Sequence, residues 1–498
     1  MSTSAIGAQS GLAIQQLVAM RNQFNDLQTQ LSTGQKSQTY AGLGLNRGIT
    51  VSLNAQLSAI SGYDSTISTV STRIDLMNTA LTQMSDIGSS VGQAMVAANA
   101  TSDSSGAITA QTTAQSSLDE LLGLLNTDAG GRYLFSGRAT DTPAVESYDH
   151  ILNGDGTRAG LKQLISERTQ ADVGANGLGR LTVSQPTATS VGVAEDAGVF
   201  GFKLASANST LTGATVTGPS GSPASLSVDF TGTPNEGDAL TVRLSLPDGS
   251  SENLTLTATT KSPPGPNQFT IGATPAATAA NFQTALSSGL GTLAATSLTA
   301  ASAVAASNEF FAADANNPPQ RVAGPPFDTA TAMTAGSATD TVIWYTGEAG
   351  SDPARGTAVA QIDQSLAVSY GARANETGLR NLVQNVATLA AVTVSPGDPN
   401  AGSLSLALNQ RLSPALNSSG QQSLTDIAAQ LASAQVSVAS AKTRHQQTSG
   451  TLDDFLQQIS GVSSEEVGSQ ILALQTRMQA SMQTTAMLFQ TSLVNYLS

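Results

Sequence analysis

Apolar residues at alternating intervals of three and four mark four segments of this chain, two near each end. This heptad spacing puts the apolar side chains on one face of an α-helix, and another helix must cover that face. The simplest arrangement that covers all four faces brings both ends of the chain together in one helical bundle. The four stripes are Leu17, Met20, Phe24, Leu27 and Leu31; Ile60, Tyr63, Ile67, Val70, Ile74, Met77, Leu81 and Met84, extended by Val91 and Met95; Leu424, Ile427, Leu431, Ala434, Val438, Ala441, His445, Thr448, Leu452, Phe455, Ile459 and Val462; and Val467, Ile471, Leu474 and Met478.

Local signals set the limits of these helices. Gly34 stands where the first helix would stop, and the glycine-rich "YAGLGLNRG" (40–48) predicts a flexible connection. Ser463 and Glu466 form a capping box, which predicts the start of the last helix. A further helix is expected over about 107–127. The expected domains are a first helix (1–34), a long-helix part of the bundle (35–140), a middle region (141–420), a long helix that pairs with the bundle (421–462) and a last helix (463–498).

The middle region is predicted to be rich in β-structure, with an insert near 195–320. In residues 238–260, "DALTVRLSLPDGSSENLTLTATT", apolar and polar residues alternate on both sides of an Asp-Gly turn, which predicts a β-hairpin. "NQFTIGA" predicts a third strand, and "ATAANFQTALSSGL" (277–290) predicts a short helix on top of it. The fold class is therefore expected to be α+β: an elongated coiled-coil bundle formed by both chain ends, with a β-rich middle insertion.

The charge composition limits the classes of partner. The chain has 21 Lys and Arg against 35 Asp and Glu, a formal charge of −14, which disfavours binding to nucleic acid. Only 11% of residues are charged, against roughly 25% in typical soluble proteins. A surface that becomes buried in an assembly has this composition because desolvating charges is costly, and a solvated Ser/Thr-rich surface is the alternative. We expect no cleaved signal peptide at the N-terminus and no membrane insertion.

Patterns that would indicate catalysis or metal binding are weak. The chain contains no cysteine and two histidines, and His445 falls on a heptad stripe, where packing explains it better than catalysis. The "GSSVG" string at 88–92 fits a nucleophile motif, but it lies inside a predicted helix instead of a strand-to-helix turn. Carboxylates that are adjacent in sequence, such as Asp453 and Asp454, point in different directions on a helix. We therefore predict no enzymatic activity, no cofactor and no metal.

Several strings resemble the bacterial flagellin superfamily. The N-terminal "LAIQQLVAMRNQFNDLQTQLSTGQK" is similar to the family's first helix, and "GGRYLFSGRATDTPAV" (130–145) is similar to its "GxYLFSG" turn. The segment "YGARANETGLRNLVQNVATLAAV" (370–392) resembles one that precedes the C-terminal helices in junction-type members. "SSEEVGSQILALQTRMQASMQTTAMLFQTSLVNYL" resembles the last helix. The resemblance is closest to the hook–filament junction type, hook-associated protein 3.

This resemblance implies an axial structural protein of the bacterial flagellum. Such a protein would be exported unfolded and would work outside the cell in motility. Its expected partners are copies of itself, homologous flagellar subunits (hook-associated proteins and flagellin) and an export chaperone. Two alternatives remain: the filament flagellin itself, or, from another class, a secreted adhesin whose helices form a stalk.

The resemblance also gives a role to residues 478–498, "MQASMQTTAMLFQTSLVNYLS", which carry no charged side chain. On this interpretation, the first and last helices become ordered when neighbouring subunits cover their apolar stripes. The alternative is that the stripes pack only within one subunit. The expected assembly face is Leu17, Phe24, Leu27, Leu31, Leu474, Met482, Phe489 and Leu493.

Overall fold

The computed structural model describes residues 2–101, 103–416 and 422–497; the side chains of 2–10, 101, 415–416, 488–489 and 491–497 are outside this description. The chain divides into two compact units. We call them the terminal unit (Met1–Ser71, Ala360–Val368 and Val436–Ser498) and the central unit (Thr72–Val359 and Ser369–Gln435). Each is described by itself.

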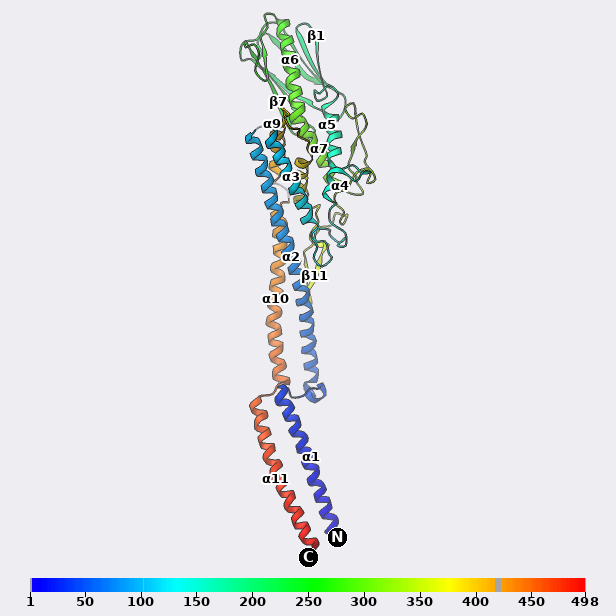
Figure 1. The fold of residues 1–498 in the computed structure, drawn as a ribbon, viewed down its shortest axis with the longest axis vertical. Helices are drawn as coiled ribbons and strands as arrows, with labels where there is room; N and C mark the ends of the chain where they lie inside the picture. Colours follow the sequence, from blue (N-terminus) through cyan, green and yellow to red (C-terminus); the bar gives the residue numbers. More distant parts are fainter. Residues whose placement is uncertain (1, 102, 417–421, 498) are drawn as a thin grey trace. The chain divides into compact units, whose positions relative to one another are not determined.

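Two helix pairs build the terminal unit. Helix α1 (Ser2–Thr33) lies antiparallel beside helix α11 (Ser464–Leu497) (Figure 1). A 3₁₀-helix, η1 (Tyr40–Asn46), then leads into α2 (Arg47–Thr101), which runs alongside α10 (Leu424–Ser460). The expected connection at 40–48 is therefore partly helical.

The α2–α10 pair follows the heptad stripes with one local shift. On α2, Ile60 and Tyr63 are half-buried and Ile67 is fully buried. On α10 the expected stripe members Thr448 and Phe455 are exposed, and Ser449 and Leu456 face inward instead. The inward-facing residues Ala441, His445 and Ser449 are separated by two successive intervals of four, where the heptad pattern expects a four and then a three. The inward-facing side of α10 is therefore displaced by one residue at Ser449 and again at Leu456.

Helices surround the core of the central unit. The last part of α2 continues the heptad stripe here, and its members from Ile74 to Met95 are buried. Helix α3 (Ser104–Leu125) begins where the Asp103 carboxylate accepts a hydrogen bond from the Gly106 amide at 2.9 Å, and it packs on α8 (Thr377–Ala391). Helices α4 (Tyr148–Asn153), α5 (Leu161–Val173), α7 (Thr299–Ala312) and α9 (Ala401–Leu416) complete the layer.

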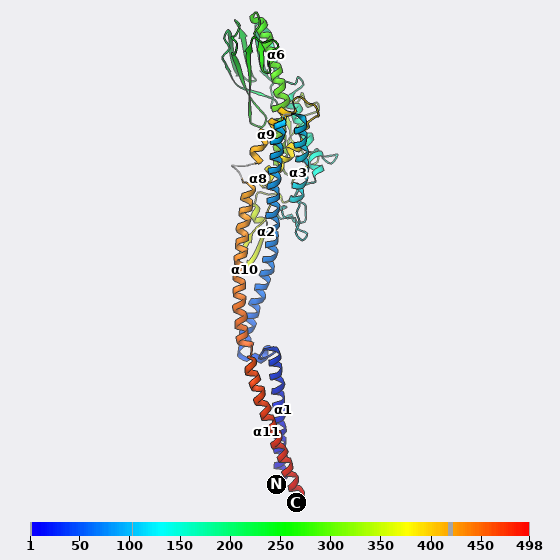
Figure 2. The ribbon, with the colours of Figure 1, turned by 60° about the vertical axis from the view of Figure 1, so that its left-hand side comes forward.

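Two four-stranded sheets form the middle of the central unit. One has the order β1-β2-β5-β4 and is antiparallel throughout; the other has the order β3-β6-β7-β8. Helix α6 (Pro275–Leu293) packs against strands of both sheets (Figure 2). The strands are β1 (Leu181–Thr187), β2 (Ser190–Glu195), β3 (Lys203–Ser209), β4 (Ala214–Gly221), β5 (Ala224–Phe230), β6 (Ala239–Ser245), β7 (Ser251–Thr259) and β8 (Gln268–Thr270).

This architecture confirms the expected α+β class with a β-rich middle region. The hairpin expected over 238–260 is β6–β7, and Leu240, Val242 and Leu244 point into the core as their alternation predicts. The third strand pairs with β7 in parallel. The remaining short elements are η2 (Ala294–Leu298), η3 (Ala354–Thr357), β9 (Arg321–Val322), β10 (Met333–Thr334), β11 (Val359–Asp363) and β12 (Leu366–Ser369).

Among the residues that the structure describes, one helical stretch has the length and composition of a membrane span. It covers Pro275–Ala312, where α6, η2 and α7 follow one another, and 67% of its most apolar window is buried within the protein. Phe282 on α6 makes edge-to-face contacts with Phe230 and Phe269 from the sheets. Core helices of soluble proteins pass the same test of length and composition. The burial therefore explains the apolar composition.

Two leucines on α9, one buried and one exposed, test whether the buried face of this helix belongs to the core. Leu408 is buried and Leu406 is exposed on the same helix. We expect Leu408→Ala to lower the free energy of unfolding by roughly 2–5 kcal/mol because it leaves a cavity. The control Leu406→Ala should change it by less than about 0.5 kcal/mol. Urea unfolding followed by the fluorescence of Trp344, the one tryptophan and a buried residue of this unit, measures both values; equal effects of the two variants would contradict the assignment.

Candidate assembly surface and the junction of the terminal helices

Helices α1 and α11 share a narrow apolar seam. Leu17, Phe24 and Leu27 from α1 are half-buried, and Leu474 from α11 is buried with 7% of its surface exposed. These four expected site residues are therefore brought to the contact between the two helices. Even along this contact, however, the three α1 side chains keep part of their surface open to solvent. Two helices alone do not cover the stripe.

Other expected site residues lie away from the seam. Leu31 is 46% exposed and Met482 is 51% exposed, while the polar side chains of Gln30 and Ser481 are half-buried at the neighbouring positions. On α11, two successive steps of four, from Leu474 to Met478 and from Met478 to Met482, exceed two helical turns by about 80°. The apolar stripe therefore rotates away from α1. The side chains of Phe489 and Leu493 lie outside the described residues.

Further apolar side chains on these helices are exposed. On α1 these are Leu12, Ile14 and Val18, of which Val18 is 54% exposed; on α11, Leu472 is 66% exposed. Most of the large apolar side chains that are exposed among the described residues belong to the terminal unit. The heptad pattern did not identify these flanking residues, because it selects only one face of each helix. Large exposed apolar patches mark interaction sites, and these side chains are candidates for such a patch.

A compact polar junction joins α1 to α2 and α10 to α11. Gly34 ends α1 with a φ of 69°, a conformation that favours glycine. Its carbonyl accepts a hydrogen bond from the Val462 amide at 3.0 Å, and the Lys36 amide donates to the Ser460 carbonyl at 2.7 Å. The two connections thus run side by side as a short antiparallel bridge at Gln35 and Gly461.

The side chain of Lys36 caps the end of α10. Its Nζ donates to the carbonyl of Ile459 at 3.0 Å and to that of Gln458 at 3.5 Å. These carbonyls belong to the last turn of the helix, where backbone acceptors lack partners and the helix dipole is negative. A cation at this position satisfies both needs. On the other side of the bridge, Ser463 caps α11, and its hydroxyl donates to Glu465, which lowers the pKa of that carboxyl.

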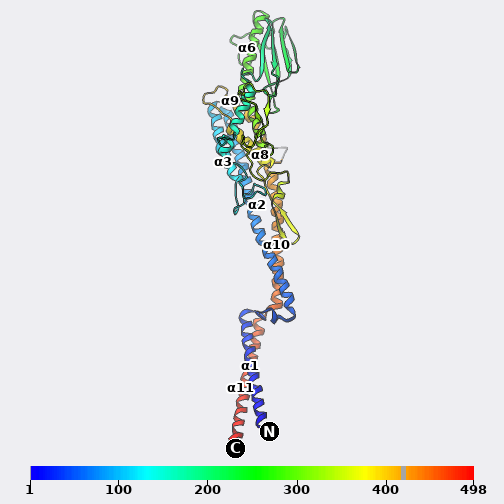
Figure 3. The same ribbon diagram turned by 90° about the vertical axis from the view of Figure 1, so that its right-hand side faces the viewer.

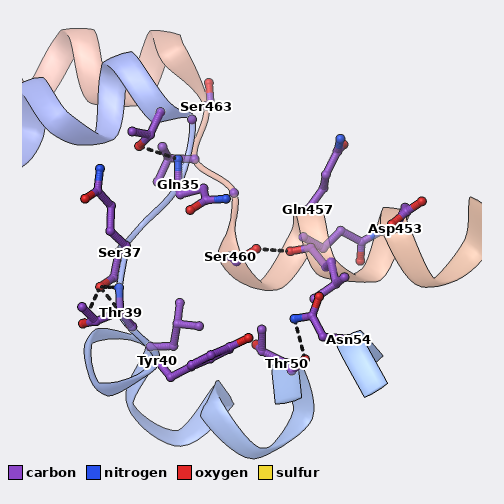
Figure 4. A pocket seen from close by; sticks show the side chains of 18 residues that line it. Gln35, Ser37, Thr39, Tyr40, Thr50, Asn54, Asp453, Gln457, Ser460 and Ser463 are labelled. Carbon is purple, nitrogen blue, oxygen red and sulfur yellow. Dashed lines mark hydrogen bonds between the residues drawn. The ribbon is translucent and has the colours of Figure 1, made fainter. Parts of the chain in front are cut away.

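An open cleft of about 1090 Å³ lies beside this junction. Figure 4 shows its polar lining, with Tyr40 and Thr50 on one side and Asp453 and Gln457 on the other. Within it, the Asn54 side chain donates to the Thr50 carbonyl at 2.9 Å. The cleft is a gap between helix ends, and its hydroxyl and amide groups show no arrangement that indicates a reaction.

The sequence patterns considered for catalysis or metal binding lie where they contribute to the fold. The "GSSVG" string at 88–92 lies within α2, so the strand-to-helix turn of a nucleophile motif is not formed there. His150 pairs with Glu146 at 2.9 Å near the start of α4. Among the described residues, no group of three or more His, Cys, Asp or Glu side chains has a geometry that would hold a metal ion.

The helical arrangement agrees with a comparison of the sequence with family models. Residues 8–140 match the bacterial flagellin N-terminal helical region. This match supports a place in the flagellin superfamily. It covers α1 from residue 8 onward, η1, α2 and α3 as well as the turn that follows. Flagellins are structural proteins, so the match supports a structural subunit of the bacterial flagellum. No curated protein matches the chain.

The cap on α10 can be tested with two lysine variants. Lys36→Ala removes the cation from the helix end, so we expect amide hydrogen exchange at residues 458–462 to accelerate roughly two- to fivefold. Lys442→Ala changes an exposed lysine in the middle of the same helix and should leave this exchange unchanged. Unaltered exchange in Lys36→Ala would show that the contact does not stabilise the junction.

Proposed function

We propose that this protein is an axial structural subunit of the bacterial flagellum that assembles through α1 and α11. The observation that carries the proposal is the apolar surface that these two helices leave exposed, together with the match of residues 8–140, which include most of α1, to the flagellin N-terminal helical region. Copies of the chain and homologous flagellar subunits would cover it. The expected face of Leu17, Phe24, Leu27, Leu31, Leu474, Met482, Phe489 and Leu493 is extended by Leu12, Ile14, Val18 and Leu472.

Docking is coupled to ordering of the terminal helices in this proposal. An isolated pair of amphipathic helices gains little stability in water. Docking against neighbours removes apolar surface from water at about 25 cal/mol per Å², and the cost of ordering offsets part of this gain. Subunits would therefore remain soluble until they reach a growing end. An export chaperone that covers the same apolar surface before assembly fits this scheme.

Within the flagellum we place the protein at the hook–filament junction. The support is the "GGRYLFSG" turn and the segment 370–392, which resemble junction-type members of the superfamily. In the central unit these two segments lie side by side. The Ala374 amide donates a hydrogen bond to the Phe135 carbonyl at 2.8 Å, and the backbones of Ser136 and Arg373 form an antiparallel β-bridge. The filament flagellin is the alternative. Labelling the protein on isolated flagella decides between them: we expect one ring at the end of the hook, and label along the filament would overturn the junction role.

Charge substitution on the exposed surface tests the assembly role. We expect Val18→Asp and Met482→Asp to reduce incorporation into flagella at least about tenfold, because each would bury an unpaired carboxylate between subunits. Leu406→Asp places the same charge at an exposed apolar position of the central unit and should stay within about twofold of the unmodified protein. Secreted protein and incorporated protein are measured separately, so loss of export is distinguished from loss of assembly. Normal incorporation of both terminal variants would refute the proposed surface.

Truncation gives a second test. A chain without residues 478–498 should be secreted but should fail to join flagella, since the uncharged part of α11 is missing. Surface binding by a truncated chain would instead favour the secreted adhesin, whose ligand site would lie in the middle region.

Limited proteolysis of the dilute monomer tests the coupled ordering. We expect cleavage within 2–33 and 464–497 to be much faster than within 72–359, because few of the described side chains of α1 and α11 are buried and many of those in the central unit are. Assembled protein should be protected in all three ranges. Equal resistance of the three ranges in the monomer would contradict ordering on docking.

A further inference from the structure

His445 is a buried titratable group with no role in the assembly surface. It lies on α10 in the terminal unit, and its side chain is only 5% exposed. Its Nδ1 is 2.8 Å from Oδ1 of Asp64 on α2, and its ring lies 6.0 Å from the ring of Tyr63. The imidazole thus connects the two long helices.

A β-hairpin approaches the other side of this imidazole. Strands β11 and β12 pair, and the tip of their hairpin, residues 360–368, belongs to the terminal unit, where Figure 3 shows it beside α10. Asp363 near the tip accepts a hydrogen bond from Arg444 at 2.7 Å. Its Oδ2 also lies 3.7 Å from Nε2 of His445. Ile362, the neighbouring residue, is fully buried.

The two ring nitrogens have different environments. An ionised carboxylate only accepts hydrogen bonds, so Nδ1 must donate its proton to Asp64. In a neutral imidazole, Nε2 then carries a lone pair, and this lone pair faces the oxygen of Asp363. Nε2 is buried and makes no hydrogen bond. A second proton on the ring turns this contact between two acceptors into an attraction between an imidazolium and a carboxylate.

Asp363 is suited to this contact because it stays ionised. The hydrogen bond from Arg444 is the main cause that lowers the pKa of the Asp363 carboxyl, and the Gln364 amide adds to it at 2.7 Å. The charged and titratable groups that face His445 are therefore Asp64 and Tyr63 from α2, Asp363 from the hairpin and Arg444 from its own helix.

We propose that His445 is a proton-dependent clasp that holds the tip of the β11–β12 hairpin against the α2–α10 pair. With the hairpin in place, the protonated ring contacts two carboxylates; with the hairpin detached, it contacts only Asp64. The added proton therefore gains a second carboxylate contact only when the hairpin is attached, and by linkage it favours attachment. The attraction to Asp363 exists only when the ring carries this proton, so attachment is stronger at low pH than at high pH. This device is independent of the assembly role proposed above.

Hydrogen exchange of the full chain tests the clasp. The protection factor of residues 360–368, corrected for the intrinsic pH dependence of exchange, should rise about threefold from about pH 8 to about pH 5, as for a partly exposed ion pair. His445→Gln retains a polar side chain that does not titrate, so protection should become independent of pH. His150→Gln, which changes the other histidine of the chain, should leave the response unchanged.

A second variant keeps the test decisive if His445→Gln fails to fold. Asp363→Asn removes the charge of the partly exposed hairpin carboxylate while leaving the histidine in place, and it should abolish the pH response. Protection of 360–368 that does not vary with pH in the unmodified chain, or a response that persists in either His445→Gln or Asp363→Asn, would overturn the clasp.

Discussion

The burial of each apolar stripe depends on how many other helices pack against it. In the central unit, a helix packs against several neighbouring helices, and side chains such as Ile74 and Val386 are fully buried. In the α1–α11 pair, one helix faces one helix, so Leu17, Phe24 and Leu27 are only half-buried. The same kind of sequence pattern therefore gives a closed core in one unit and an open surface in the other. Apolar surface that the chain does not cover itself is what a neighbouring subunit would cover.

Much of the fold could be predicted because the patterns are long or local. The α2 stripe keeps its spacing over many turns, and its members from Ile67 to Met95 are buried. The hairpin over 238–260 was specified by alternation and an Asp-Gly turn, both of which act between neighbours in sequence. The parallel pairing of β8 with β7 was not predictable in this way, because no short-range signal fixes the direction of a third strand.

The candidate surface could be predicted only in part. The stripe identified Leu474, which is buried against α1, but the flanking side chains Ile14 and Val18 were missed because a heptad register selects one face. On α10 the register shifted after His445, where a second interval of four replaced the expected three and left Phe455 exposed. Such a shift changes no residue type, so only the packing of α2 against α10 shows it.

Contacts between residues far apart in sequence could not be predicted, because no local pattern marks them. The Lys36 side chain donates to the last turn of α10, more than four hundred positions later, and Arg444 of α10 donates to Asp363 of the β11–β12 hairpin. Both contacts are polar, and both lie away from the α1–α11 seam. Few charged side chains occur along the two outer helices: α1 carries Arg21 and Asp26, and α11 carries Glu465, Glu466 and Arg477. Covering these helices therefore desolvates few charges.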